Sequence, residues 1–134
     1  MDIISKEDAK KYSPLTLAFL GDGVYELLVR HKIALDVNCF RGSCSVKKLH
    51  NRAVEKVRAS YQAAGVRAIE SILTEEEADI IRRGRNANST VPKSATVSEY
   101  RMATGLETLF GYLYLIGENE RIEELFELIY KNGS

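Results

Sequence analysis

The sequence predicts an all-α fold, and three observations support this prediction. Apolar residues recur three and four positions apart over several long stretches, which is the period of a helix that buries one side. Signals for helix starts precede these stretches. No alternating strand pattern of useful length occurs. With 134 residues, 45% of them hydrophobic, the chain is expected to form a single domain over residues 1–134, built as a helical bundle.

The first long helix is expected over residues 14 to about 35. Ser13 serves as its N-cap and Pro14 occupies its first position. One side carries an apolar stripe and the opposite side is also mostly apolar, which indicates a central and largely buried helix. The stripe comprises Leu17, Leu20, Val24 and Leu28. The opposite side comprises Leu15, Ala18, Asp22, Glu26, Val29 and Ile33.

Four further helices are expected. The second begins after the N-cap Ser45 and ends at residues 63–65. The third begins after Thr74, which forms a capping box with Glu77. A long fourth helix follows over residues 97–116, and the last begins at Asn119. Their predicted inward residues are Val46, Leu49, Ala53, Val57 and Tyr61, then Ala78 and Ile81, then Leu106, Leu109, Phe110 and Leu113, and finally Ile122, Leu125, Phe126 and Ile129.

Composition bounds the function without deciding it. Lysine plus arginine equals aspartate plus glutamate at 19 each, so net charge argues neither for nor against a nucleic-acid partner. No apolar run approaches a membrane span, and the N-terminus lacks the order of a signal peptide. We therefore expect a cytoplasmic protein with no membrane contact. Cys39 and Cys44 have no Cys/His cluster around them and are expected to be free thiols.

Asp22 lies between two glycines in the first helix, Gly21 and Gly23. Glycine inside a helix costs roughly 1 kcal/mol relative to alanine. We interpret both glycines as allowing Asp22 to approach a neighbouring helix closely. Asp22 also lies on the second apolar face, where a carboxylate without a partner is costly.

Glu107 is the expected second half of this site. Residues 102–116 contain no other charged residue, and the small neighbours Ala103 and Gly111 permit close packing. Two carboxylates brought together repel unless a cation lies between them, and such oxygen ligands suit Mg²⁺. The alternative is that both acids form structural salt bridges with arginines. The arginines available for such bridges are Arg30, Arg52, Arg58 and Arg101.

A basic cluster follows the third helix. It comprises Arg82, Arg83, Arg85 and Asn86, and Lys93 lies in the irregular stretch 86–98. Arginine forks fit phosphates, double-stranded RNA is recognised mainly by its shape and backbone, and loops of this length are often functional. We expect these residues to bind RNA. The alternatives are that a helix C-terminus favours one or two of the arginines and that the loop is an idle surface loop.

Three other polar residues are expected to play no direct chemical part. Glu26 lies four residues from both Asp22 and Arg30, which favours a salt bridge over a ligand role. His31 and His50 lack a nucleophile with a supporting acid at a suggestive spacing, so we treat them as surface or packing residues.

Two stretches resemble the ribonuclease III family. Residues 17–26 read Leu-Ala-Phe-Leu-Gly-Asp-Gly-Val-Tyr-Glu, which resembles the family signature Leu-Glu-Phe-Leu-Gly-Asp-Ala/Ser-Val-Leu. Residues 104–111 read Thr-Gly-Leu-Glu-Thr-Leu-Phe-Gly, which resembles the second motif Asp-Ala-Phe-Glu-Ala-Leu-Ile-Gly. With the arginine cluster, and no room for a double-stranded-RNA-binding domain, the chain resembles Mini-ribonuclease III, the stand-alone catalytic domains of this family. Two positions that carry acids in full-length ribonuclease III are occupied by Ala18 and Thr104 here, as in that subfamily.

The resemblance implies a Mg²⁺-dependent endoribonuclease that hydrolyses double-stranded RNA and leaves 5′-phosphate ends. By this resemblance, Asp22 and Glu107 are the catalytic and metal-binding residues. The resemblance also implies a homodimer with two sites. The expected substrate is the stem of precursor 23S ribosomal RNA. Two other functions stay open. The first is a catalytically silent scaffold of the same fold that binds RNA during ribosome assembly, and the second is a helical protein–protein adaptor.

Overall fold

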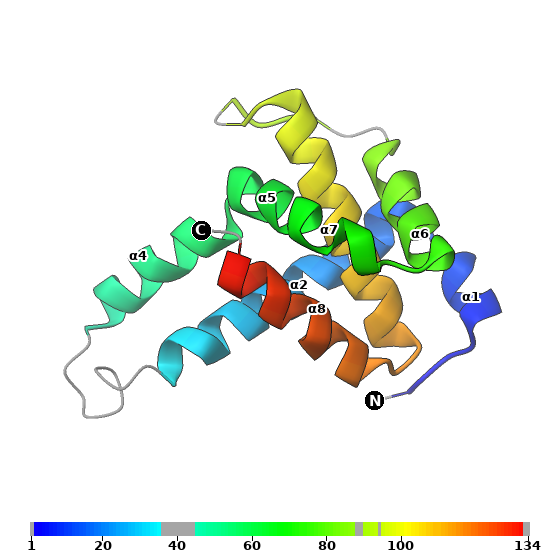
Figure 1. Ribbon diagram of the computed structural model, residues 1–134, viewed down its shortest axis with the longest axis horizontal. Helices are drawn as coiled ribbons and strands as arrows, with labels where there is room; N and C mark the ends of the chain where they lie inside the picture. The colour runs from blue at the N-terminus through cyan, green and yellow to red at the C-terminus, as the bar shows by residue number, and fades with distance from the viewer. Residues whose placement is uncertain (1, 36–44, 88–89, 94, 133–134) are drawn as a thin grey trace.

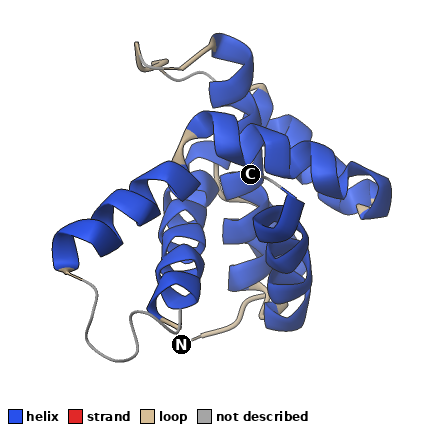
Figure 2. Ribbon diagram, turned by 60° about the vertical axis from the view of Figure 1, so that its left-hand side comes forward, coloured by secondary structure: helices blue, strands red, loops and turns tan. Residues whose placement is uncertain are grey.

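The computed structural model describes residues 2–35, 45–87, 90–93 and 95–132, and all regular structure within these ranges is helical (Figure 2). The prediction of an all-α fold is therefore confirmed. The elements in chain order are α1 Lys6–Lys10, α2 Pro14–Ala34, α4 Val46–Val57, α5 Ala59–Ile69, the short 3₁₀ helix η1 Glu70–Ile72, α6 Glu75–Arg85, α7 Val97–Leu115 and α8 Asn119–Asn132.

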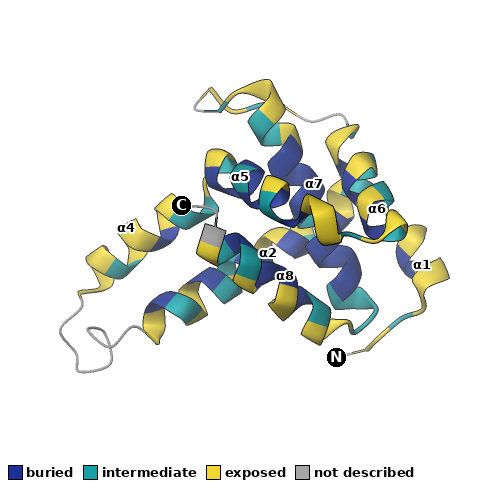
Figure 3. Ribbon diagram, viewed as in Figure 1, coloured by how far each residue is buried: buried dark blue, intermediate teal, exposed yellow. Residues whose placement is uncertain are grey.

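Helix α7 runs through the middle of the molecule and contacts α2, α5, α6 and α8 (Figure 1). From Met102 to Leu113 every residue of α7 except Glu107 is buried, whereas α4 is largely exposed and lies beside the last turns of α2 at one side of the molecule (Figure 3). Helix α7 begins at the expected residue and ends one residue before the expected end, and α8 begins at Asn119 as expected. Their predicted inward residues are confirmed as core: Leu106, Leu109, Phe110, Leu113, Ile122, Leu125, Phe126 and Ile129.

Helix α2 begins as predicted but is not buried all round. The Ser13 hydroxyl accepts a hydrogen bond from the Thr16 amide at 3.1 Å, and Pro14 is the first helical residue. The helix packs against α7 on one side only, so three apolar residues of the other side lie in solvent: Leu15, Phe19 and Leu27 are 39%, 84% and 68% exposed. The buried residues are Leu17, Ala18, Gly21, Tyr25, Val29 and Ile33.

The predicted second helix is two helices, and this part of the prediction is wrong. The chain turns at Arg58, whose ψ of 147° is extended, so α4 ends at Val57 and α5 begins at Ala59. Gly65 does not end a helix; it lies inside α5, where a β-carbon would come 2.5 Å from the Ile129 side chain of α8. Val46 is not an inward residue either, since it is 81% exposed on the projecting α4.

Helix α6 has the predicted capping box. The Thr74 amide donates to Glu77 Oε1 at 2.9 Å, and the Glu77 amide donates to Thr74 Oγ1 at 3.1 Å. Ile81 is buried as expected, together with Ile80. Ala78, predicted to point inward, is exposed instead, because the side of α6 that faces α7 carries Ile80, Ile81 and Gly84.

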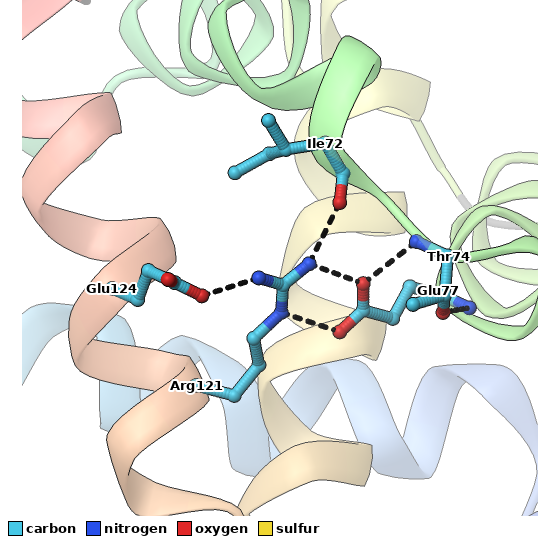
Figure 4. Close-up of polar contacts among 5 residues, drawn as sticks. All are labelled: Ile72, Thr74, Glu77, Arg121 and Glu124. Carbon is cyan, nitrogen blue, oxygen red and sulfur yellow. Dashed lines mark hydrogen bonds and ion pairs between the residues drawn. The ribbon is translucent and has the colours of Figure 1, made fainter.

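Arg121 joins α8 to the start of α6 (Figure 4). Its Nε and Nη2 each donate to one oxygen of Glu77 at 2.8 Å, and Nη2 also donates to the Ile72 carbonyl at 2.8 Å. Burial of Glu77 would raise its pKa, but the bonds from Arg121 and Thr74 outweigh this and lower the pKa of that carboxyl. The network therefore fixes α6 against the body of the fold with its charge compensated.

Helix α1 was not predicted from the sequence. It is only five residues long and is held by tertiary contacts, including a hydrogen bond from Lys10 Nζ to Glu76 Oε2 at 3.3 Å. In the ranges that the structure describes, no helix is both long and apolar enough to cross a membrane.

Candidate active site

Asp22 and Glu107 are brought together where α2 and α7 touch backbone to backbone. A β-carbon on Gly21 would lie 1.6 Å from the Glu107 carbonyl oxygen. A β-carbon on Gly111 would lie 1.9 Å from the Leu17 carbonyl oxygen. Only glycine fits at these two positions, so the close approach expected for Gly21 and Gly111 is present.

Gly23 does not take part in this approach. A β-carbon there would meet nothing within 4 Å, and the residue is exposed. The interpretation of Gly23 as a close-packing residue is therefore wrong within this chain. Two positions after Gly21, the helix has turned by about 200°, so Gly23 faces away from α7.

The two carboxyl groups interact directly. Burial first, and then the neighbouring Asp22 carboxylate, raise the pKa of Glu107 to about 9, while a hydrogen bond from Gln62 opposes this shift. The pair lines an open cavity of about 330 Å³, in which Glu107 is partly buried and Asp22 is exposed, so the expectation that Asp22 lies on a buried face is wrong. Among the residues with described side chains, no arginine or lysine forms an ion pair with Asp22 or Glu107. The cavity is lined by Leu15, Ala18, Phe19, Asp22, Tyr100, Thr104 and Glu107.

This pair fits a divalent cation with a large water shell. The described parts of the chain contain no cluster of three or more His, Cys, Asp or Glu side chains that could hold a metal. Two carboxylates alone are few ligands for Zn²⁺ or Ca²⁺, but Mg²⁺ commonly uses one or two carboxylates and keeps several waters. A cation between Asp22 and Glu107 would also favour the charged form of Glu107, which burial and the neighbouring Asp22 carboxylate disfavour.

A second cavity, of about 520 Å³, shares Glu107 and Tyr100 with the first. It extends from Glu107 to the α4–α5 junction at Arg58, and to Pro92 and Ala95 of the loop before α7. Gln62 carries no motif that would mark it in the sequence, and Arg58 was expected there only as a salt-bridge partner. Burial of a polar residue is the signal that identifies Gln62, and it is visible only in the fold.

The predicted RNA-binding residues lie near this site only in part. Arg82 pairs with Asp79, and Arg83 Nη2 donates to the Lys10 carbonyl at 3.3 Å. Arg85 runs along α7 at Gly105, and Asn86 caps the end of α6. No α6 residue lines either cavity. Lys93 is exposed beside Pro92, which lines the larger cavity, so the loop rather than α6 borders Glu107.

Comparison with known proteins decides the family. Residues 15–118 match the ribonuclease III domain. The chain belongs to the ribonuclease III family. Membership makes it an endoribonuclease. It is 48% identical to Mini-ribonuclease 3 of Thermoanaerobacter sp. (95% of this chain, 87% of the relative) and 44% identical to that of Clostridium tetani (93% and 81%). A crystal structure of a Fusobacterium nucleatum protein matches with a TM-score of 0.81 at 35% identity, covering 92% of this chain and 96% of the other.

The two positions at which the ribonuclease III signature has further acids flank the carboxyl pair. Ala18 and Thr104 both line the smaller cavity, so their loss as acids leaves this site with two carboxylates. The Thr104 hydroxyl donates to the Tyr100 carbonyl of its own helix at 2.9 Å.

The remaining polar candidates behave as expected where they are described. Glu26 accepts a hydrogen bond from Arg30 Nη2 at 2.8 Å, which is the predicted salt bridge. His31 and His50 are exposed. Cys39 and Cys44 lie outside the described residues.

The shifted pKa of Glu107 predicts how stability depends on pH without metal. Glu107 in the folded chain holds its proton up to about pH 9, whereas an unfolded glutamate, with a pKa of 4.5, loses it near that pH. The free energy of unfolding in EDTA should therefore fall as pH rises from about 4.5 to 9, by at most about 1.4 kcal/mol per pH unit. Urea unfolding at several pH values measures this slope. Glu107→Gln should flatten the slope and the control Glu26→Gln should not; equal slopes in all three would contradict the assignment.

Proposed function

We propose that this endoribonuclease cleaves double-stranded RNA in the cytoplasm with Mg²⁺, and that the stem of precursor 23S ribosomal RNA is its substrate. The observation that supports it is the Asp22–Glu107 pair, in which burial and an adjacent carboxylate raise the pKa of Glu107. Such a pair is costly in a fold unless a cation compensates it. The proposed products carry 5′-phosphate ends.

In the proposed mechanism Asp22 and Glu107 would hold the cation from facing helices. When bound, a divalent cation supplies Lewis-acid polarisation of the scissile phosphodiester and compensates its developing charge. The glycine contact between α2 and α7 keeps the two carboxyl groups at a constant separation, because rigid helix backbones rather than loops position them. Tyr100 and Thr104 line the same cavity and limit the space beside the carboxyl pair.

Cleavage of a long RNA duplex tests this proposal. The protein is expected to cut the duplex in Mg²⁺ or Mn²⁺, to stop in EDTA, and to leave single-stranded RNA of the same composition largely intact. If the protein binds the duplex but never cuts it with either metal, the silent RNA-binding scaffold takes its place. If it shows no salt-dependent RNA binding at all, the adaptor function is favoured, because phosphate contacts must weaken as salt rises.

We propose that Arg82, Arg83, Arg85, Asn86 and Lys93 bind the RNA backbone. Replacing the three arginines by alanine is expected to weaken duplex binding and to reduce the salt slope by up to about three, one per phosphate contact. Binding titrations at several salt concentrations measure both quantities. The control is a second triple variant that removes the same charge from other exposed positions. It combines Lys11→Ala, Arg67→Ala and Lys131→Ala. Equal weakening in both triple variants would assign the effect to net charge alone.

The proposed homodimer has a candidate interface on the open side of α2. Leu15, Phe19 and Leu27 lie four and eight residues apart, and Phe19 is 84% exposed. Exposed apolar groups that gather on one face commonly mark an interaction surface. Leu15 and Phe19 also line the cavity of the carboxyl pair, so a second copy there would border the site.

Phe19→Glu should therefore convert the dimer to a monomer, because burying a phenylalanine side chain is worth about 1.5–3 kcal/mol and a buried charge opposes docking. Light scattering after gel filtration measures the mass. Val46→Glu is the matched control, since Val46 is 81% exposed on α4. A wild-type protein that is monomeric while it cleaves would count against this interface.

We also propose that the catalytic domain spans residues 1–134. The family match ends at residue 118, but Arg121 of α8 is bonded to Glu77, and the Ile4 amide donates to the Leu115 carbonyl at 3.0 Å. These contacts support the inclusion of both ends in one folding unit.

A further inference from the structure

Gln62 lies beside the Asp22–Glu107 pair and has an oxygen without a partner. The residue is 2% exposed and lines the larger cavity together with Glu107. Its Nε2 donates to the Val57 carbonyl at 3.0 Å, and the amide also acts to lower the pKa of the nearby Glu107 carboxyl. Its Oε1 is buried and has no hydrogen-bond partner within the described part of the molecule.

The neighbours of this amide determine which atom is the nitrogen. The Val57 carbonyl can only accept a hydrogen bond, so the atom that faces it at 3.0 Å must be Nε2. Rotating the amide by 180° would set two oxygens against each other. The atom left without a partner is therefore the acceptor, Oε1, and a buried acceptor in that condition costs free energy.

Gln62 and Glu107 line the same cavity, so the amide that carries Oε1 and the carboxyl that would hold the proposed cation border one space. Oxygen donors are scarce at this site, because Ala18 and Thr104 bring no carboxylate to it. Amide oxygens are suitable partners for hard divalent cations and for the waters that these cations keep.

We propose that Gln62 Oε1 is an oxygen donor to a divalent cation held by Asp22 and Glu107, either directly or through one of the waters of that cation. This inference rests on the proposed function, which places a cation between the two carboxylates. It adds a third side chain to the site, from α5, so that the cation is reached from three helices.

Gln62 also has a structural contact that a test must separate. By donating to the Val57 carbonyl it caps the end of α4, next to the turn at Arg58. A variant can therefore lose stability without any effect on cation binding. The readout is the affinity for Mn²⁺, measured by calorimetry or electron paramagnetic resonance without RNA, beside thermal unfolding in EDTA.

Three substitutions at this position separate the possible roles. Gln62→Met keeps the length and removes both polar atoms, and it should lower Mn²⁺ affinity by about 10- to 100-fold. Gln62→Glu keeps an oxygen but loses the amide donor, and it should bind Mn²⁺ at least as tightly as wild type. Gln62→Asn is one methylene shorter and should weaken binding, so it tests the proposal if the methionine variant does not fold. Ser60→Ala, in the same cavity, should leave the affinity unchanged.

Wild-type affinity in folded Gln62→Met or Gln62→Asn would overturn the proposal. Equal losses in the methionine and glutamate variants would also overturn it, because they would assign the effect to the amide donor rather than to Oε1. Asp22→Asn separates this inference from the proposed function. If Asp22→Asn binds Mn²⁺ normally, the cation site itself is wrong; if it loses Mn²⁺ while Gln62→Met does not, only the inference about Gln62 fails.

Discussion

Asp22→Asn and Glu107→Gln are each expected to lower cleavage of duplex RNA by at least about 100-fold, because losing a residue that only hydrogen-bonds a metal ligand already costs about 10- to 100-fold. Both substitutions keep the shape of the side chain and remove the negative charge that would hold a cation. Glu107→Gln should also unfold at a higher temperature than wild type in EDTA at pH 8, because burial and the neighbouring Asp22 force wild-type Glu107 to take up a proton on folding at that pH, and glutamine needs none. Loss of cleavage together with a gain of stability would identify a cation-binding active site rather than a pair of side chains that stabilises the fold.

Two measurements control this result. Glu26→Gln removes a carboxylate four residues from Asp22, but one that is paired with Arg30, and it should cleave at close to the wild-type rate. Duplex binding without metal should persist in both site variants, because the three arginines proposed to bind RNA line neither cavity. Wild-type cleavage by either Asp22→Asn or Glu107→Gln would remove that residue from the proposed site.

Gly21→Ala should be the most destabilising substitution on α2. The added β-carbon would lie 1.6 Å from the Glu107 backbone oxygen and 2.8 Å from the Gly111 amide nitrogen, and neither atom belongs to a flexible side chain. The two helices must separate, at a cost of about 3 kcal/mol or more, which corresponds to a melting temperature lower by roughly 10 °C. Any protein that remains folded should lose cleavage, because the separation of the two carboxyl groups changes.

Gly23→Ala is the matched control, two residues away on the same helix. Its β-carbon would meet nothing within 4 Å, and alanine favours the helix by roughly 1 kcal/mol. Its melting temperature should therefore rise by a few degrees. Equal destabilisation by the two alanines would contradict the close contact at Gly21, and destabilisation by Gly23→Ala alone would mean that a second copy packs against Gly23.

The local features of this protein were readable from its sequence. The Ser13 and Thr74 caps, the inward faces of α7 and α8, and the absence of strands in the described ranges depend on neighbours three or four residues apart. Such short-range patterns are written directly in the chain. The two acids stood out for a similar reason, because a carboxylate among apolar residues is conspicuous without any knowledge of the fold.

What surrounds those acids was decided by tertiary structure alone. Gly21 and Gly23 look equivalent in the sequence, yet only Gly21 meets a neighbouring backbone. The burial of Gln62, the exposure of Phe19 and the turn at Arg58 depend on which helix packs where, and packing is a property of distant segments. The sequence by itself therefore determined the helices and the two carboxylates. Only the tertiary structure decided which partners they meet, because residues far apart in the chain share no local pattern that would reveal their contact.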